Sequence, residues 1–274
     1  MLEGQGDNRP IGVFDSGVGG LTVLDAIHRL LPNEHLVYLG DTARVPYGTK
    51  SSDSVVKYAC QAAEALVVKD IKALVIACNT ASASALPKLC ETYPDIPVIG
   101  VVVPGAEASV RQTSSHHVGV IATEGTINNG AYHREIAARL PSATVKGVAC
   151  SLFVALAEEG WCDGDLVESI VAKCLTPILD DAQIDTLVLG CTHFPALKGA
   201  IANVVGEKVA LVDSAQTTAM SLKASLADKA MLADAAQVAD VAFMVTDGVE
   251  RFSRVAKHFI SIPVKPSSVQ LVDV

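Results

Sequence analysis

Two stretches of similar sequence, Ala73-Leu-Val-Ile-Ala-Cys-Asn-Thr80 and Thr186-Leu-Val-Leu-Gly-Cys-Thr-His193, each place a cysteine directly after a short apolar run. Runs of leucine and β-branched residues of this length are typical of buried parallel strands. Small hydroxyl or amide residues follow each cysteine, and such residues are favoured at helix N-caps. The pattern predicts a thiol at each of two strand-to-helix junctions, where the helix dipole would lower its pKa and favour the thiolate. Two such thiols suggest a pair that acts from opposite sides of one substrate.

The rest of the chain alternates between strand-like and helical patterns on both sides of these stretches. We expect further strands at Ile11–Phe14, Leu36–Leu39, Val98–Val102 and Val118–Ile121. We expect helices at about 21–31, 52–69, 129–140, 151–159 and 163–181. Such alternation predicts an α/β fold with mostly parallel sheets.

The two halves of the chain repeat one pattern. Ile11-Gly-Val-Phe-Asp-Ser-Gly17 is similar to Val118-Gly-Val-Ile-Ala-Thr-Glu-Gly125, and a cysteine stretch follows each at a similar distance. The repeat predicts two similar three-layer α/β domains related by pseudo-twofold symmetry, although convergent α/β patterns can explain part of it. Ligands of such sheets bind beyond the carboxyl ends of the strands. We therefore expect the active site in the cleft between the two domains.

The composition narrows the class of protein. The chain of 274 residues has a net charge of −9, with 50% hydrophobic and 19% charged residues. This acidity argues against nucleic acid or an anionic membrane as a partner, and no apolar run approaches the roughly 18 residues of a membrane span. Residues 1–10 are polar, lack the apolar core of a signal peptide and are expected to form a loose tail. With no C-x-x-C pair among the cysteines, we expect a reduced, cytoplasmic protein.

The remaining cysteines are expected to be packing residues, because they lie in helical or apolar contexts and free cysteine is commonly a small buried hydrophobe. They are Cys60, Cys90, Cys150, Cys162 and Cys174. A structural role is also the alternative for Cys78 and Cys191. Their matched settings, with polar residues directly after each, favour a functional role.

A glycine-rich turn follows the first expected strand, in Phe14-Asp-Ser-Gly-Val-Gly-Gly-Leu21. Backbone N–H groups of such a turn can bind an anion. The turn lacks the last glycine of a dinucleotide fingerprint and the lysine of a phosphate loop. Asp15 is placed to bind an ammonium group or to orient a neighbouring thiol, and capping of the next helix is the alternative.

Two further candidates carry polar groups suited to an amino-acid substrate. The loop Asp41-Thr-Ala-Arg-Val-Pro-Tyr-Gly48 offers the Tyr47 hydroxyl and the Gly48 N–H to a carboxylate, unless it is a plain surface turn. His193 can donate a proton or hold Cys191 in its working ionisation state. The spacing of Cys191 and His193 does not match a structural zinc motif, so we expect no metal.

Together these stretches resemble the glutamate racemases of the cofactor-independent Asp/Glu racemase family. The matching pieces are 14–21, 40–48, Ala77-Cys-Asn-Thr-Ala-Ser82, Gly125-Thr126 and Gly190-Cys-Thr-His-Phe-Pro195, in the family's order. The resemblance implies an active site between two α/β domains. It also implies that the chain returns to the first domain, which would comprise residues 1–99 and 207–274, with residues 100–206 as the second.

The resemblance further implies a two-base reaction on glutamate that uses no cofactor. Cys78 and Cys191 would serve opposite faces of Cα; Asp15 would assist Cys78, and His193 would assist Cys191. Asp15 and Ser16 would meet the amine side of the substrate. The residues expected around its carboxylates are Pro46, Tyr47, Gly48, Asn79, Thr80, Thr126 and Thr192.

Glu158 matches an acidic family residue and is a further catalytic candidate. Its surroundings depart from the family pattern, because Ser151 and Ala155 stand where proline is common. The product, D-glutamate, would supply peptidoglycan synthesis, and the enzyme is expected to be a homodimer.

Three other readings compete with this one. An aspartate racemase would share the two thiols, but such enzymes usually carry Glu after the second Cys-Thr, where this chain has His193. A fold relative without catalytic activity could bind and regulate another enzyme. A thiol redox protein would need cysteines close enough to form a disulfide, and two thiols separated by a substrate are too far apart.

Overall fold

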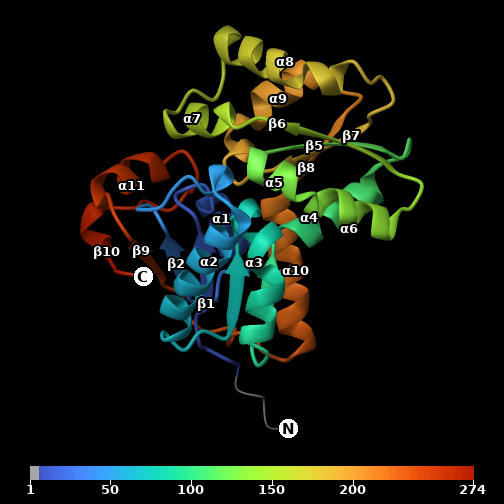
Figure 1. The fold of residues 1–274 in the computed structure, drawn as a ribbon. Coiled ribbons are helices and arrows are strands. Elements are labelled where there is room, and N and C mark those ends of the chain that lie inside the picture. The colour runs from blue at the N-terminus through green and yellow to red at the C-terminus, as the bar shows by residue number, and fades with distance from the viewer. Residues whose placement is uncertain (1–5) are drawn as a thin grey trace.

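Ten strands form two parallel sheets in the part of the chain that the structure, a computed structural model, describes, residues 6–274 (Figure 1). The first sheet has the strand order β10-β9-β2-β1-β3-β4, and all neighbouring strands run parallel. Its strands are β1 (Ile11–Asp15), β2 (Leu36–Gly40), β3 (Ala73–Ile76), β4 (Val98–Gly100), β9 (Val241–Val245) and β10 (Val269–Leu271). Every residue of β1 and β3 is buried, as expected of strands covered by helices on both faces.

The second sheet has the order β6-β5-β7-β8 and is also parallel throughout. Its strands are β5 (His117–Ala122), β6 (Thr144–Ala149), β7 (Thr186–Gly190) and β8 (Ala210–Asp213). This order repeats that of β2-β1-β3-β4 in the first sheet, with β5 in the place of β1 and β7 in the place of β3. The predicted α/β fold with two similar parallel units is confirmed.

Helices connect the strands and cover the sheets. They are α1 (Leu21–Leu30), α2 (Ser52–Val67), α3 (Asn79–Thr92), α4 (Val102–Gln112), α5 (Glu124–Asn129), α6 (Ala131–Arg139), α7 (Leu152–Glu158), α8 (Asp165–Leu179), α9 (Lys198–Val205), α10 (Ser214–Asp228) and α11 (Val249–Ala256). Short 3-10 turns lie at η1 (Tyr47–Thr49), η2 (Phe194–Leu197) and η3 (Pro266–Ser268). The helix expected at 129–140 instead begins at Ala131, because Gly130 adopts a left-handed conformation, φ +70°, that separates α5 from α6.

The chain leaves the second sheet later than the sequence predicted. The expected boundary at residue 207 precedes β8, yet β8 pairs with β7 over Ala210–Asp213. From there α10 packs against α1 and α4, and β9 then joins the free edge of β2. The apolar residues of β8 complete the second sheet, so a boundary between the sheets falls after Asp213. The division into two domains stays a prediction.

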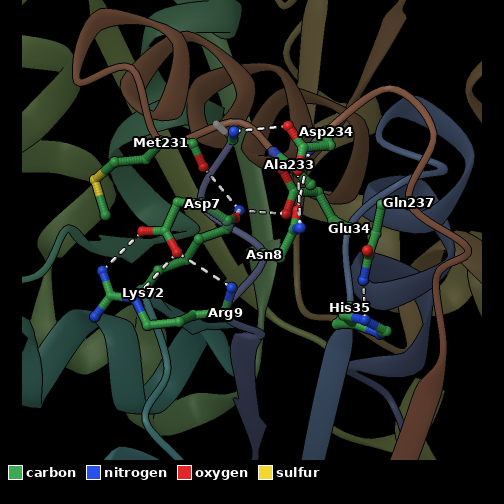
Figure 2. Close-up of polar contacts among 11 residues, drawn as sticks. Asp7, Asn8, Arg9, Glu34, His35, Lys72, Met231, Ala233, Asp234 and Gln237 are labelled. Carbon is green, nitrogen blue, oxygen red and sulfur yellow. Dashed lines mark hydrogen bonds and ion pairs between the residues drawn. The ribbon is translucent and has the colours of Figure 1, made fainter. Parts of the chain in front are cut away.

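The N-terminal segment is not loose from residue 6 onward, because Gly6 binds Asp234 in the connection between α10 and β9 and Asp7 binds Lys72 just before β3 (Figure 2). The wholly buried Lys72 ammonium forms an ion pair with Glu34 at 2.5 Å and donates hydrogen bonds to the Asp7 and Met231 carbonyls. Glu34 also accepts a hydrogen bond from the Ala233 N–H at 2.9 Å. Residues 1–5 of the expected tail lie outside the described part of the chain.

Candidate active site

The loops at the carboxyl ends of β1, β2, β3, β5 and β7 meet in one small pocket that Cys78 enters from the first sheet and Cys191 from the second. The lining residues are Ser16, Val45, Pro46, Tyr47, Gly48, Cys78, Asn79, Thr80, Thr123, Val154, Cys191, Thr192 and His193. Most of the predicted site residues are therefore neighbours around one cavity. Asp15, Thr126 and Glu158 lie behind this lining, each close to a residue that belongs to it.

Cys78 is the N-cap residue of α3, at the strand-to-helix junction that the sequence predicted. The expectation of a lowered pKa at this thiol was wrong: burial and the negative charge of Asp15 raise the pKa of Cys78 to about 12. Loss of water and a carboxylate neighbour both disfavour a thiolate, and together they outweigh the helix N-terminus. Cys78 is therefore a thiol at neutral pH.

Asp15 ends β1 and is fully buried beneath the pocket. Burial raises the pKa of its carboxyl group. One carboxylate oxygen accepts a hydrogen bond from the Gly17 N–H at 2.9 Å, whereas Oδ1 is buried without a partner among the described residues. A buried oxygen without a donor is costly, so Oδ1 of Asp15 is an unused acceptor beneath the pocket.

Cys191 has a histidine as its neighbour instead of a carboxylate. The Nδ1 atom of His193 lies 3.8 Å from the Cys191 sulfur, and its Nε2 atom lies 3.1 Å from Glu158 Oε1. Burial alone would lower the pKa of His193, but the hydrogen bonds to Cys191 and Glu158 outweigh burial and raise the pKa to about 10. A protonated imidazole favours a thiolate beside it. The helix expected directly after Cys191 starts later, at Lys198, behind the 3-10 turn η2.

Glu158 ends α7 and bridges two cations. Burial would raise the pKa of this carboxyl group, but its contacts with His193 and with Arg251 outweigh burial and lower it. The Arg251 guanidinium donates a hydrogen bond to Glu158 Oε2 at 2.9 Å. Sequence reasoning did not find Arg251, because it lies 93 positions after Glu158 on a different helix, α11.

Three threonine hydroxyls close a triangle at one side of the pocket. Thr80 lies 3.0 Å from both Thr123 and Thr126, and these two lie 3.1 Å apart. The sequence pointed to Thr80 and Thr126 but not to Thr123, although its place as N-cap of α5 was a usable signal. Each hydroxyl can turn its proton toward a carboxylate, because a hydroxyl both donates and accepts.

The loop after β2 is held by Asp41, which the sequence analysis did not single out. This buried carboxylate accepts hydrogen bonds from the Tyr47 hydroxyl, from Arg44 Nε at 2.6 Å and from Thr246 Oγ1 at 2.9 Å. Because the Tyr47 hydroxyl donates to Asp41, a carboxylate in the pocket would meet the loop's backbone instead. A Cβ at Gly48 would lie 2.6 Å from that of Thr123, so only glycine fits here.

Asn79 presents an unused donor at the start of α3. Its Oδ1 atom accepts a hydrogen bond from the Tyr132 hydroxyl at 2.7 Å, and its Nδ2 atom is buried without a partner among the described residues. The tyrosine holds the oxygen of the amide, which leaves the N–H groups of Asn79, a residue that lines the pocket, available to a bound group. An anionic group there would satisfy them.

Two further properties of residues 6–274 bear on the class of protein. No group of three or more His, Cys, Asp or Glu side chains is arranged to hold a metal ion. No helix in this range combines the length and the apolar character that crossing a membrane requires.

Comparison with known proteins places the chain among racemases. The profile of the Asp/Glu/hydantoin racemase family matches residues 11–222. The chain belongs to this family and is an enzyme, an amino-acid racemase of the isomerase class.

The most similar relatives in these comparisons are glutamate racemases, as the sequence resemblance predicted. The glutamate racemase of Geobacter metallireducens is 48% identical over 252 residues, which cover 92% of this chain and 93% of the relative. The crystal structure of a glutamate racemase isoform from Bacillus anthracis matches with a TM-score of 0.92 and 38% identity over 98% of both chains. The glutamate racemase of Francisella tularensis in complex with D-glutamate matches with a TM-score of 0.90 and 38% identity, covering 97% of this chain and 98% of that one.

Proposed function

We propose that this enzyme interconverts L-glutamate and D-glutamate by proton transfer between Cα and two cysteines, Cys78 and Cys191. The observation that carries the proposal is the placement of both thiols on one pocket, each at the end of the equivalent strand of its own sheet. Racemisation removes the proton from one face of Cα and delivers a proton to the other. A single pocket between two thiols suits that chemistry.

In one direction a thiolate takes the Cα proton and becomes a thiol, while the thiol on the opposite side gives its proton to Cα and becomes a thiolate. In the reverse direction the two cysteines exchange roles. The negative charge that develops on the substrate must be stabilised by donors fixed in place and by exclusion of water. Both cysteines and His193 are buried, which keeps water from the reacting atoms.

The unequal surroundings of the two thiols support a starting state for the reaction. Cys78 lies beside Asp15 and holds its proton, whereas Cys191 lies beside an imidazole whose pKa is raised to about 10. We assign Cys78 as the proton donor and Cys191, assisted by His193, as the base in the first direction of the reaction. Turnover in this direction leaves Cys78 as thiolate, and Asp15 then supports its reprotonation.

Recognition of glutamate would use the donors around the pocket. The Asn79 side-chain N–H groups, the three threonine hydroxyls and the backbone at Tyr47 and Gly48 suit the two carboxylates. The buried Oδ1 atom of Asp15 suits the substrate ammonium, with Ser16 beside it. Glutamate is favoured over aspartate as the substrate because His193 follows the second Cys-Thr, where aspartate racemases usually carry Glu.

In the cell, D-glutamate made by this reaction would supply peptidoglycan synthesis. A cytoplasmic homodimer that needs neither a cofactor nor a nucleic-acid or membrane partner fits this role.

The test is interconversion of L- and D-glutamate followed by circular dichroism, with no cofactor added. We expect both enantiomers to reach the same racemic end point. Faster racemisation of aspartate than of glutamate would assign the site to the other acidic amino acid. No change in the ellipticity of either amino acid would contradict the proposed reaction.

A further inference from the structure

Arg251 contacts Glu158, and Glu158 in turn contacts His193, the imidazole beside Cys191. Its guanidinium donates to Glu158 Oε2 at 2.9 Å, and the other oxygen of that carboxylate, Oε1, lies 3.1 Å from His193 Nε2. Arg251 lies on α11, attached to the first sheet, whereas Glu158 lies on α7, attached to the second (Figure 1). The chain of contacts therefore runs from the half of the molecule built on the first sheet to the imidazole beside Cys191 in the other half.

We propose that Arg251 is a positioning residue of the reaction, which holds the Glu158 carboxylate in the orientation that His193 requires. This inference rests on the proposed function. A glutamate side chain has three rotatable bonds, and contacts at both carboxylate oxygens are what fix its end. Without Arg251, one oxygen of Glu158 loses its partner, and the carboxylate is free to turn toward solvent.

The exposed fraction of the side chain increases from His193 to Glu158 to Arg251. His193 is 6% exposed, Glu158 18% and Arg251 54%. The arginine is thus the outer end of a path that leads from solvent to the buried imidazole. Because a partly exposed pair is screened by water, its effect on the reaction is modest.

The other charged groups near this path are few among the described residues. Glu159 lies 3.9 Å from the Arg251 guanidinium, and Asp247 lines a small cavity together with Glu158 and Arg251. On the inner side, Cys191 and Asp15 are the charged or titratable neighbours of His193. None of these provides a second cation for the Glu158 carboxylate.

The contact with Arg251 contributes to the lowered pKa of Glu158. Removing the guanidinium therefore raises that pKa, so the carboxylate becomes protonated at higher pH. The rate of the enzyme, which needs ionised Glu158 beside His193, should then begin to fall at higher pH on the acid side of its profile. Loss of a residue that merely supports the fold would not shift the pH at which the rate begins to fall on the acid side, which is called the acid limb below.

The test compares Arg251→Gln, Arg251→Lys and Arg254→Gln in both reaction directions across a range of pH. Arg254 lies on the same helix, α11, and is also exposed, so it controls for loss of a surface charge. We expect Arg251→Gln to lower kcat about fivefold, the size typical of a partly exposed ion pair, with little change in KM. The acid limb should move to higher pH. Lysine should restore most of the rate, because the contact is made through one guanidinium nitrogen.

Equal rates and pH profiles for Arg251→Gln and Arg254→Gln would overturn the inference. A loss of kcat with an unmoved acid limb, or a change in KM alone, would also overturn it, since neither acts through Glu158. Thermal melting of each variant separates these results from unfolding. If the unaltered enzyme fails to racemise glutamate in the same assay, the proposed function fails instead.

Discussion

Neighbouring side chains, more than position in the fold, distinguish the two thiols. Cys78 and Cys191 end equivalent strands, yet one lies beside a carboxylate and the other beside an imidazole. Burial and a negative neighbour raise a thiol pKa, whereas a positive neighbour favours the thiolate. The proposed reaction needs one proton donor and one base, and this asymmetry suits Cys78 to the first role and Cys191 to the second.

The first prediction concerns the thiols themselves. Replacement of Cys78 or Cys191 by alanine should each abolish racemisation, because each face of Cα needs its own acid–base group. Cys90→Ala is the control, since Cys90 is exposed on α3 and lies outside the pocket lining. Rates of both directions are measured by circular dichroism. Near-normal turnover in either of the first two variants would contradict the two-thiol mechanism.

The second prediction concerns His193 and the pH dependence of stability. Its pKa rises from 6.5, the ordinary value, to about 10 in the folded protein. Between pH 6.5 and pH 9 the folded state therefore holds a proton that the unfolded state has lost, so the free energy of unfolding falls as pH rises. Above pH 9, Cys78 adds a fall of the same sign.

Denaturant unfolding at several pH values tests this, with His193→Asn against the unaltered protein. We expect the fall between pH 6.5 and pH 9 to be smaller in the variant. His258→Asn controls for the loss of any histidine. Identical pH dependence in His193→Asn and the unaltered protein would show that His193 does not hold its proton as described.

At the scale of elements, the loop between β2 and α2 is the part of the site that depends most on distant chain. Asp41 anchors it to Arg44 and Tyr47 within the loop and to Thr246 after β9. The backbone that is expected to meet a carboxylate, at Tyr47 and Gly48, is thus positioned by a segment about two hundred residues later in the chain.

The third prediction is that Asp41→Ala raises KM for glutamate more than it lowers kcat, because the loop is proposed to bind substrate and to carry neither of the two bases of the reaction. The free energy of unfolding should also fall, by about 3 kcal/mol, since Arg44 and two hydroxyls lose their buried acceptor. Asp95→Ala is the control, as Asp95 is exposed. Steady-state kinetics with an unchanged KM would contradict this role of the loop.

Sequence patterns predicted the strand before each cysteine and the helix after Cys78, because buried parallel strands have strong local signals, but they also placed a helix directly after Cys191, where the 3-10 turn η2 comes first. They did not predict β8, β9 or α11, because the apolar runs in residues 207–274 are short. The strands among them form only by pairing with strands that come earlier in the chain, β8 with β7 and β9 with β2. The same limit applies within the site. Local motifs pointed to Cys78, His193 and Thr80, whereas Asp41 and Arg251 acquire their roles only through partners distant in sequence.

For the molecule as a whole, a buried ion pair lies at the amino-terminal ends of the strands of the first sheet, opposite to the end that carries the pocket. Lys72 and Glu34 are both nearly inaccessible, and Lys72 also binds carbonyls from the N-terminal segment and from the connection between α10 and β9 (Figure 2). Two distant parts of the chain thus share one ammonium group. Removing one charge leaves the other buried and unpaired.

The fourth prediction is that Lys72→Met lowers the free energy of unfolding by about 3–5 kcal/mol, and that adding Glu34→Gln recovers part of the loss. Lys88→Met is the control, because its ion pair with Glu91 is exposed and should contribute at most about 1 kcal/mol. Denaturant unfolding measures the free energy of unfolding of Lys72→Met, of Lys72→Met with Glu34→Gln, and of Lys88→Met. Equal losses in Lys72→Met and Lys88→Met would contradict the importance of the buried pair.

The two-base reaction itself is tested most directly by the route of the Cα proton. L-glutamate is converted in heavy water to low conversion, the enantiomers are separated, and proton NMR measures deuterium at Cα of each. We expect D-glutamate to carry deuterium while recovered L-glutamate stays almost unlabelled. The product face is protonated by a thiol that has exchanged with solvent, and a proton taken by the other thiol can return only to the face it left. Early D-glutamate that retains the original Cα proton would show that one base serves both faces, and would contradict the mechanism built on Cys78 and Cys191.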